Sequence, residues 1–207
     1  IAKRWQAGCD LLLGKDDGFP AMNADERTAY AEGDFVRAAA GYKRVQATEK
    51  AVVDGLARGL APADAVNGAS DVQTRFWIAA WQAAVFNRVL ARRVADSTFD
   101  TLLPGDVAYD HETREYVHVT DAMAADESVK ARVKSFELSP TAALPGINTI
   151  PASGTPGEIE REEFEREGLE LDQLTWVFKR LGDSAGGTRR PLRVRVERPE
   201  AEGGVDE

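Results

Sequence analysis

The sequence predicts an α+β fold, in which a helix-rich domain carries a β-hairpin or small antiparallel sheet and is followed by a terminal strand. Three observations support this class. Alanine-rich segments with helical spacing fill residues 24–68, and one long helix is expected over residues 71–94. Two short alternating segments, 106–109 and 115–119, flank a turn and predict a hairpin.

The first helical region is broken by glycines, which separate its alanine-rich pieces at Gly33, Gly41 and Gly59. Asp34 and Thr48 are expected to cap helices, because a short polar side chain can accept a bond from a free N–H of the first turn. Pro62 suits the first position of a short helix. No catalytic spacing is present here, so we expect a helical scaffold.

The long helix has a defined start, since Ser70 and Gln73 have the spacing of a capping box. Its apolar residues fall into two stripes, which are Phe76, Ala80, Ala83, Phe86, Leu90 and Val94, and then Trp77, Trp81, Ala84 and Val85. Two stripes predict a helix that is covered on more than one side and lies in the middle of a packed domain.

After the hairpin, Asp121 is expected to cap a helix that runs toward Ser135. Residues 138–157 are rich in Pro, Gly, Ser and Thr and predict a long loop. A further helix is expected from Thr155, with a capping box and a proline at its first position.

The last ordered element is expected at residues 189–196, where apolar and arginine residues alternate. Leu192, Val194 and Val196 would face a core, while Arg193 and Arg195 would form an outward arginine face. The acidic, glycine-containing segment 199–207 is expected to be disordered.

Composition excludes several classes of site. His111 and His118 lack ligand spacing, so we expect no metal site, and neither common glycine-rich phosphate loop is present. The single cysteine, Cys9, cannot form an internal disulfide and fits a reducing, cytoplasmic setting. A formal net charge of -9 argues against generic binding to nucleic acid, and no apolar run is long enough to cross a membrane.

The basic residues are nevertheless clustered. Five arginines lie between residues 188 and 198, at positions 189, 190, 193, 195 and 198. The long helix adds Arg75, Arg88, Arg92 and Arg93 without an acid between Arg75 and Val94. Such clusters can bind a phosphate backbone, or they can form a solvated face that nearby acids balance.

Several segments together resemble the TruD family of tRNA pseudouridine synthases. The matching segments lie in order over about 120 residues and are Phe76–Asn87, Leu103–Asp106, Tyr116–Thr120, Leu138–Gly146, Gly154–Glu160 and Gly187–Arg190. The resemblance implies that residues 1–185 form the domain that this family inserts into its catalytic domain. Residues 186–198 would then be the strand that returns into the catalytic-domain sheet.

The resemblance also implies a function. Such enzymes are isomerases that need no cofactor. They flip a uridine out of tRNA, at position 13 in the D-arm by family expectation, and reattach its base to the sugar through a carbon atom. The partners it implies are tRNA and the catalytic domain of the same polypeptide, in a monomer, with neither DNA nor a membrane as partner. Arg189 and Arg190, together with Arg193 and Arg195, are the expected RNA-binding residues.

No catalytic residue is assigned in this chain. The family's aspartate follows a Gly-x-Lys segment upstream of the inserted domain, and the similar Gly14-Lys15-Asp16-Asp17 lacks the residues that follow in the family. We therefore expect a chain without its nucleophile that helps to shape the RNA-binding cleft. The alternative is a stand-alone, non-catalytic domain that binds RNA or protein.

Overall fold

A computed structural model describes residues 4–15, 18, 20–166, 175, 179, 181–182, 186–197 and 200 of the chain. The chain divides into two compact units, Ile1–Ala80 and Trp81–Glu207, and helix α6 (Asp71–Ala95) carries the boundary. The segment 199–207, for which disorder is expected, lies outside the described residues except for Glu200. The domain limits at residues 185 and 198 stay a prediction.

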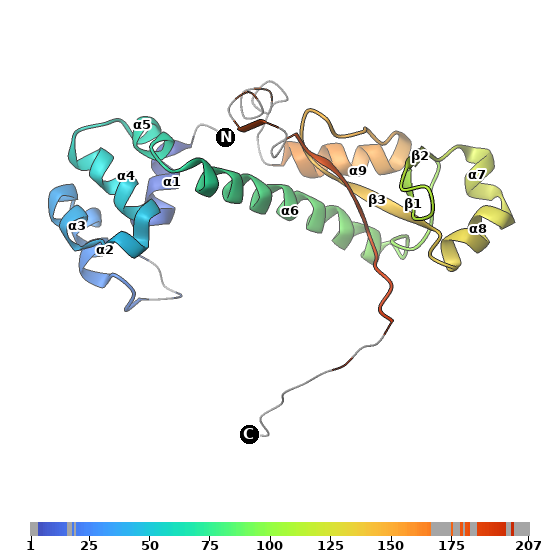
Figure 1. The fold of residues 1–207 in the computed structure, drawn as a ribbon, viewed down its shortest axis with the longest axis horizontal. Coiled ribbons are helices and arrows are strands. Elements are labelled where there is room, and N and C mark those ends of the chain that lie inside the picture. The colour runs from blue at the N-terminus through green and yellow to red at the C-terminus, as the bar shows by residue number, and fades with distance from the viewer. Residues whose placement is uncertain are drawn as a thin grey trace. The chain divides into compact units, whose positions relative to one another are not determined.

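The first unit is helical, as predicted (Figure 1). Asp34 caps a helix as expected, since its side chain accepts a bond from Arg37 N at 3.0 Å. Pro62 is the first residue of its helix. The predicted cap at Thr48 is wrong, because that helix begins one residue earlier, at Ala47. The elements are α1 (Trp5–Leu13), α2 (Ala24–Ala31), α3 (Phe35–Gly41), the 3-10 helix η1 (Arg44–Gln46), α4 (Ala47–Ala57) and α5 (Pro62–Asn67).

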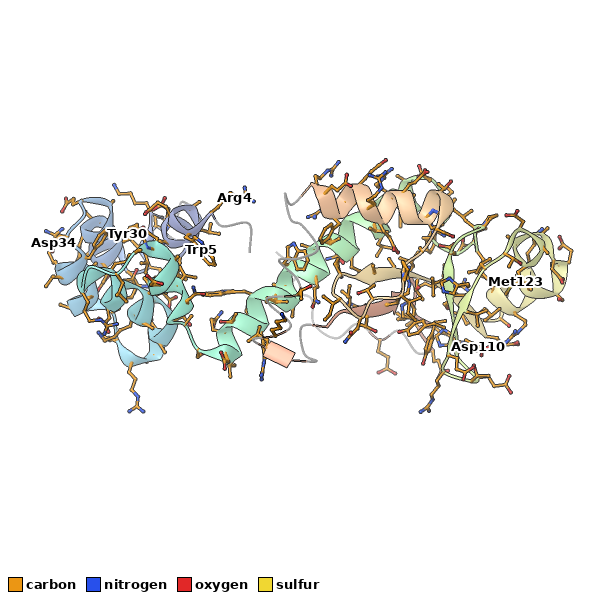
Figure 2. All side chains as sticks on the ribbon, turned by 90° about the horizontal axis from the view of Figure 1, so that it is seen from above. Arg4, Trp5, Tyr30, Asp34, Asp110 and Met123 are labelled. Carbon is orange, nitrogen blue, oxygen red and sulfur yellow. The ribbon has the colours of Figure 1, made fainter. Side chains whose placement is uncertain are left out.

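The core of the first unit lies among α1, α2, α3, α4 and α5 and contains Leu13, Val52 and Val53, each fully buried. Tyr30, labelled in Figure 2, is buried at its edge, and its hydroxyl donates a 2.7 Å hydrogen bond to Asp10 Oδ1. That bond satisfies the one polar atom of an otherwise apolar ring, so the ring can pack inside.

Helix α6 is confirmed, and Ser70 Oγ accepts a bond from Gln73 N at its start. The predicted buried faces are partly wrong, because Phe76 is 66% and Val94 is 52% exposed. The buried residues instead form one stripe with helical spacing, Ile78, Gln82, Val85, Phe86, Val89 and Arg93. The helix therefore buries a single face that includes two polar side chains.

The second unit contains a four-stranded antiparallel sheet in the order β2-β1-β3-β4, which confirms the α+β class. The predicted hairpin is present, with Ala108 of one strand opposite Val117 of the other. The strands are β1 (Val107–Asp110), β2 (Tyr116–His118), β3 (Leu138–Leu144) and β4 (Thr188–Pro191).

The loop predicted at residues 138–157 is wrong at both ends, where strand β3 and the start of the next helix lie, and is confirmed for residues 145–153. Six of the seven residues of β3 are buried, so the segment lacks the alternation of a strand with one solvated face. Pro140 is tolerated at the point where the pairing with β4 ends, and its carbonyl still accepts a bond from Leu192 N.

Among the described residues, further helices pack around this sheet beside α6. The single helix expected after Asp121 is two, α7 (Asp121–Ala125) and α8 (Glu127–Lys134), because Asp126 interrupts it and caps α8 through Ser128 N. The predicted cap at Asp121 is wrong, because Thr120 caps α7 by accepting a bond from Met123 N. Helix α9 (Gly154–Glu165) is confirmed, but it begins at Gly154 without the expected side-chain cap. The described residues contain no helix long and apolar enough to cross a bilayer.

Candidate functional site

Arg189 is the centre of a buried hydrogen-bonded group in the second unit. It lies in β4, its residue is 3% exposed, and its guanidinium donates to groups on three sides. Nε donates to Thr141 Oγ1 of β3 at 2.7 Å, and Nη1 donates to Ile150 O at 2.7 Å. Both terminal nitrogens bond to the carboxylate of Glu160 on α9.

Glu160 completes this arrangement. One of its carboxylate oxygens also accepts a bond from Ala143 N of β3 at 3.1 Å. Tyr116 of β2 donates its hydroxyl to the backbone oxygen of Arg189 at 2.8 Å. The group therefore connects three strands and α9. A guanidinium that bonds to a carboxylate through two nitrogens forms a stronger contact than a single hydrogen bond.

The loops beside this group pack backbone against backbone. Gly187 has a φ of +78°, and a side chain there would lie 2.5 Å from Gly146 Cα. A side chain at Gly146 would lie 2.3 Å from the carbonyl of Gly186. Glycine is thus required at both positions by the close approach of the two chain segments, one after β3 and one before β4.

The four arginines expected to bind RNA have different surroundings. Arg190 is exposed, with its guanidinium carbon 5.2 Å from the ring centre of Phe86, and Arg195 is exposed as well. Arg193 is half-buried and donates to Val133 O and Leu138 O, while its guanidinium lies 4.2 Å from the ring centre of Phe136. Arg189 is internally paired.

The predicted strand with an outward arginine face is wrong in its extent and its orientation. Strand β4 ends at Pro191, and Val194 and Val196, expected inside, are 75% and 67% exposed. Neighbouring residues of a strand point to opposite sides, so Arg189 turns inward and Arg190 outward. The buried position of Arg189 is possible because Glu160 neutralises its charge.

The arginines of α6 are also partnered by acids. Arg88 and Arg92 both approach Glu163 of α9, whose side chain is 2% exposed, at 3.2 Å and 3.4 Å. Arg93 is buried, and its guanidinium donates to both carboxylate oxygens of Asp106, at 2.8 Å and 3.1 Å. Two interpretations of these basic residues were open, a phosphate-binding cluster or a face balanced by nearby acids. The second applies to Arg88, Arg92 and Arg93.

Groups for nucleophilic or metal chemistry are scattered. Cys9 is fully buried, and burial raises the pKa of its thiol and so favours the less reactive neutral form. His111 bonds to Ser139 Oγ at 3.0 Å, and His118 is exposed on β2. Within the described part of the chain, no group of three or more His, Cys, Asp or Glu residues could hold a metal ion.

Three segments that are far apart in the sequence therefore meet at one place. Thr141 lies in the segment Leu138–Gly146, Glu160 in Gly154–Glu160 and Arg189 in Gly187–Arg190. The spacing rules for helices and strands could not reveal Glu160 as a partner, because it lies 29 residues from Arg189. Glu160 is the last residue of the segment Gly154–Glu160, and the resemblance of that segment to the TruD family was its signal in the sequence.

A family model described as tRNA pseudouridine synthase D (TruD) matches residues 1–206. The tRNA pseudouridine synthase D of Geobacter sulfurreducens is 32% identical over 97% of this chain and 47% of its own length. The protein of the same name from Anaeromyxobacter sp. is 38% identical over 59% of this chain and 33% of its own length. The chain belongs to the TruD family.

A crystal structure named for tRNA pseudouridine synthase D (TruD) from Methanosarcina mazei superposes with a TM-score of 0.74. It is 22% identical in sequence, and the match covers 90% of this chain and 44% of that chain. At this identity the likeness shows the fold. The chain thus spans about half the length of the proteins that it matches.

Proposed function

We propose that this chain is part of a tRNA pseudouridine synthase, which isomerises a uridine of tRNA to pseudouridine, at position 13 by family expectation. The observation that carries the proposal is the match of the TruD model to nearly the whole chain. In this proposal the described residues help to form the cleft that receives tRNA. The enzyme works in the cytoplasm as a monomer and needs no cofactor.

The direct RNA contacts in this proposal come from Arg190 and Arg195, which are exposed. Arg189 and Arg193 contribute by holding the polypeptide that carries them, since their guanidinium groups bond within the chain. Phosphate contacts of this kind position an RNA rather than read its sequence. Arg190 and Arg195 would therefore raise the affinity for many tRNAs equally.

The nucleophile is proposed to lie in another part of the polypeptide, outside these 207 residues. The similar aspartates, Asp16 and Asp17, are outside the described residues and lack the family's following sequence. The alternative function is a stand-alone scaffold that binds RNA or protein without chemistry. Two observations favour that alternative. The net charge is -9, and arginines such as Arg88 and Arg93 are paired with acids of the same chain.

Release of tritium from unmodified tRNA labelled at C5 of uridine tests the proposal. The 207-residue chain should bind the tRNA but release no tritium above a no-protein control. A longer protein from the same reading frame should release tritium. Turnover by the chain alone would make Asp16 and Asp17 the candidate nucleophiles. A longer protein without turnover would favour the non-catalytic scaffold.

A further inference from the structure

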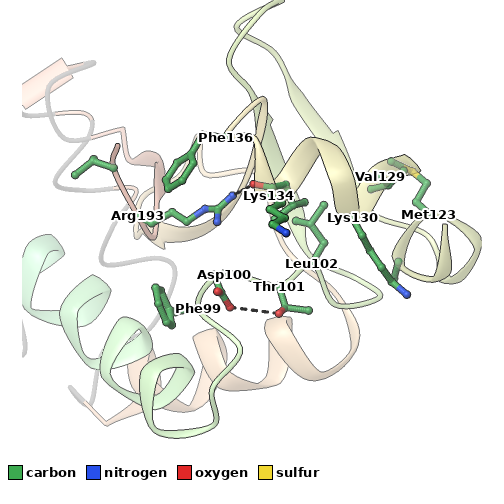
Figure 3. Close-up of a pocket in the computed structure, with 13 residues that line it drawn as sticks. Phe99, Asp100, Thr101, Leu102, Met123, Val129, Lys130, Lys134, Phe136 and Arg193 are labelled. Atoms are coloured by element: carbon green, nitrogen blue, oxygen red, sulfur yellow. Dashed lines mark hydrogen bonds between the residues drawn. The ribbon is translucent and has the colours of Figure 1, made fainter. Parts of the chain in front are cut away.

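A cavity of about 610 Å³ opens in the second unit, apart from the group around Arg189 (Figure 3). Residues 99–102, helices α7 and α8 and the segment after β4 line it. Its wall is apolar and is formed by Leu102, Met123, Val129 and Val133, which belong to a core cluster of this unit. The volume is in the range of small-molecule sites.

The charges around the cavity are mostly positive. Lys130, Lys134 and Arg193 line it, against a single lining acid, Asp100, although the whole chain has a net charge of -9. Lys130 also forms a 2.8 Å ion pair with Glu127. Lys134 is exposed on α8. Arg193 Nε is buried without a hydrogen-bond partner among the described residues. A cationic cavity in an acidic protein is suited to an anionic ligand.

Two phenyl rings lie at the cavity. Figure 3 shows Phe136 beside Arg193, and Phe99 next to Asp100. Phe99 is 36% exposed, although it is a large apolar side chain. Phe136 has a φ of +65°, a left-handed conformation that glycine adopts much more readily than a residue with a side chain.

The strained Phe136 follows α8, at a position where helices commonly end in glycine. Its backbone N–H donates to Val133 O, so the helix could end in the same way with glycine there. The side chain is therefore not explained by the end of the helix. It packs against the guanidinium of Arg193 and completes the aromatic side of the cavity.

We propose that this cavity holds a single unpaired nucleotide of the RNA, with the base against the exposed ring of Phe99 and the phosphate on Lys134. The inference rests on the proposed function, which makes RNA the ligand. Bases stack on aromatic side chains regardless of their identity, and nearby cations bind the backbone. A purely apolar ligand would leave Lys134 without an anionic partner, and an inorganic anion would leave the ring of Phe99 uncovered.

The test uses the whole 207-residue chain labelled with nitrogen-15 and titrated with AMP, because NMR detects binding of about millimolar strength. Amides of residues 99–102 and 129–136 should shift together, whereas adenosine or inorganic phosphate alone should shift them less. Phe99→Ala should weaken AMP binding about fivefold or more, because it removes one stacking surface. Lys134→Ala should weaken it about threefold and reduce its salt dependence.

Two matched variants are the controls. Phe76→Ala removes an exposed phenyl ring, and Arg58→Ala an exposed cation, both in the first unit, and neither should change AMP binding. Equal effects of the pocket and control variants, or shifts outside the cavity, would overturn the inference. Photocrosslinking of a 4-thiouridine oligonucleotide should likewise label peptides that line the cavity.

Binding of tRNA to the same proteins separates the two proposals. If tRNA binds and AMP leaves the cavity amides unchanged, the cavity inference fails while the proposed function stands. A cavity that takes an acidic apolar peptide in place of AMP would overturn the inference in the same way. If tRNA does not bind, the proposed function fails together with the inference that rests on it.

Discussion

The guanidinium of Arg189 and the carboxylate of Glu160 form a buried ion pair that fastens strand β4 to helix α9. The side chains are 0% and 13% exposed. A charge in such a place is stable only while its partner remains, because the desolvation of the lone charge is not compensated. The pair is therefore a structural contact at the start of the segment for which RNA binding is predicted.

Glu160→Ala should reduce the free energy of unfolding by about 3–5 kcal/mol, since it leaves Arg189 buried and unpaired. Urea denaturation followed by circular dichroism measures the loss. Glu162→Ala is the matched control on the same helix, because Glu162 is 53% exposed beside Arg92 and should contribute about 1 kcal/mol or less. A similar loss in both variants would contradict the assignment.

The two phenylalanines of α6 provide a second test of which face is buried. Phe86 is 3% exposed within a core cluster, whereas Phe76 is 66% exposed. Phe86→Ala should cost about 3–5 kcal/mol, from the reduced burial and the cavity left behind. Phe76→Ala should change the free energy of unfolding by about 0.5 kcal/mol or less. The thermal midpoints of the two variants report the difference directly.

The errors in the sequence prediction of α6 have a physical cause. The hydrophobic spacing and the capping residues identified the helix and its start. The predicted buried faces, however, contained only apolar residues. Gln82 and Arg93 are buried because each finds a partner outside the helix, Pro145 O at 2.8 Å for Gln82 and Asp106 for Arg93. Such partners depend on tertiary contacts, which a local pattern does not contain.

Strands β3 and β4 were mispredicted for the same reason. The hairpin of β1 and β2 is local and alternates, so the sequence predicted it correctly. Strand β3 lies inside the sheet, between β1 and β4, and carries Pro140, which is typical of loops. At β4, the arginine pattern predicted an outward face, and the burial of Arg189 depends on Glu160.

Acidification tests the turn between β1 and β2. The Arg132 guanidinium, 2.8 Å from Asp110 Oδ2, and the backbone N–H groups of Thr113 and Glu112 hold the pKa of Asp110 below its usual range. A lowered folded-state pKa contributes stability above the unfolded value of about 3.9. That contribution should be lost as the pH falls below about 4.

Asp110→Asn keeps an acceptor for the turn but removes the charge, so it should cost about 1 kcal/mol at neutral pH. The difference from the original chain should shrink as the pH falls below about 4, when Asp110 itself becomes protonated. Arg132→Met should flatten the same acid limb because it removes the main cause of the shift. A difference that stays constant with pH in thermal unfolding would refute this role.

The last prediction concerns the exposed arginines and tRNA. Arg190→Ala and Arg195→Ala together would remove up to two phosphate contacts at constant fold, because neither guanidinium is needed for a buried ion pair. The slope of log affinity against log salt should then shrink by about 0.7–0.9 for each phosphate that is no longer neutralised. Fluorescence anisotropy with labelled tRNA at several salt concentrations measures this slope.

The matched control removes two exposed arginines of the first unit, with Arg44→Ala and Arg58→Ala, so that the change in net charge is the same. A local contact at β4 predicts a smaller slope only in the first pair, whereas a general charge effect predicts equal changes in both. Arg189 is unsuitable for this experiment, because its removal would leave Glu160 buried without its partner and reduce stability. An unchanged slope without Arg190 and Arg195 would mean that these cations are a solvated face and that tRNA binds elsewhere.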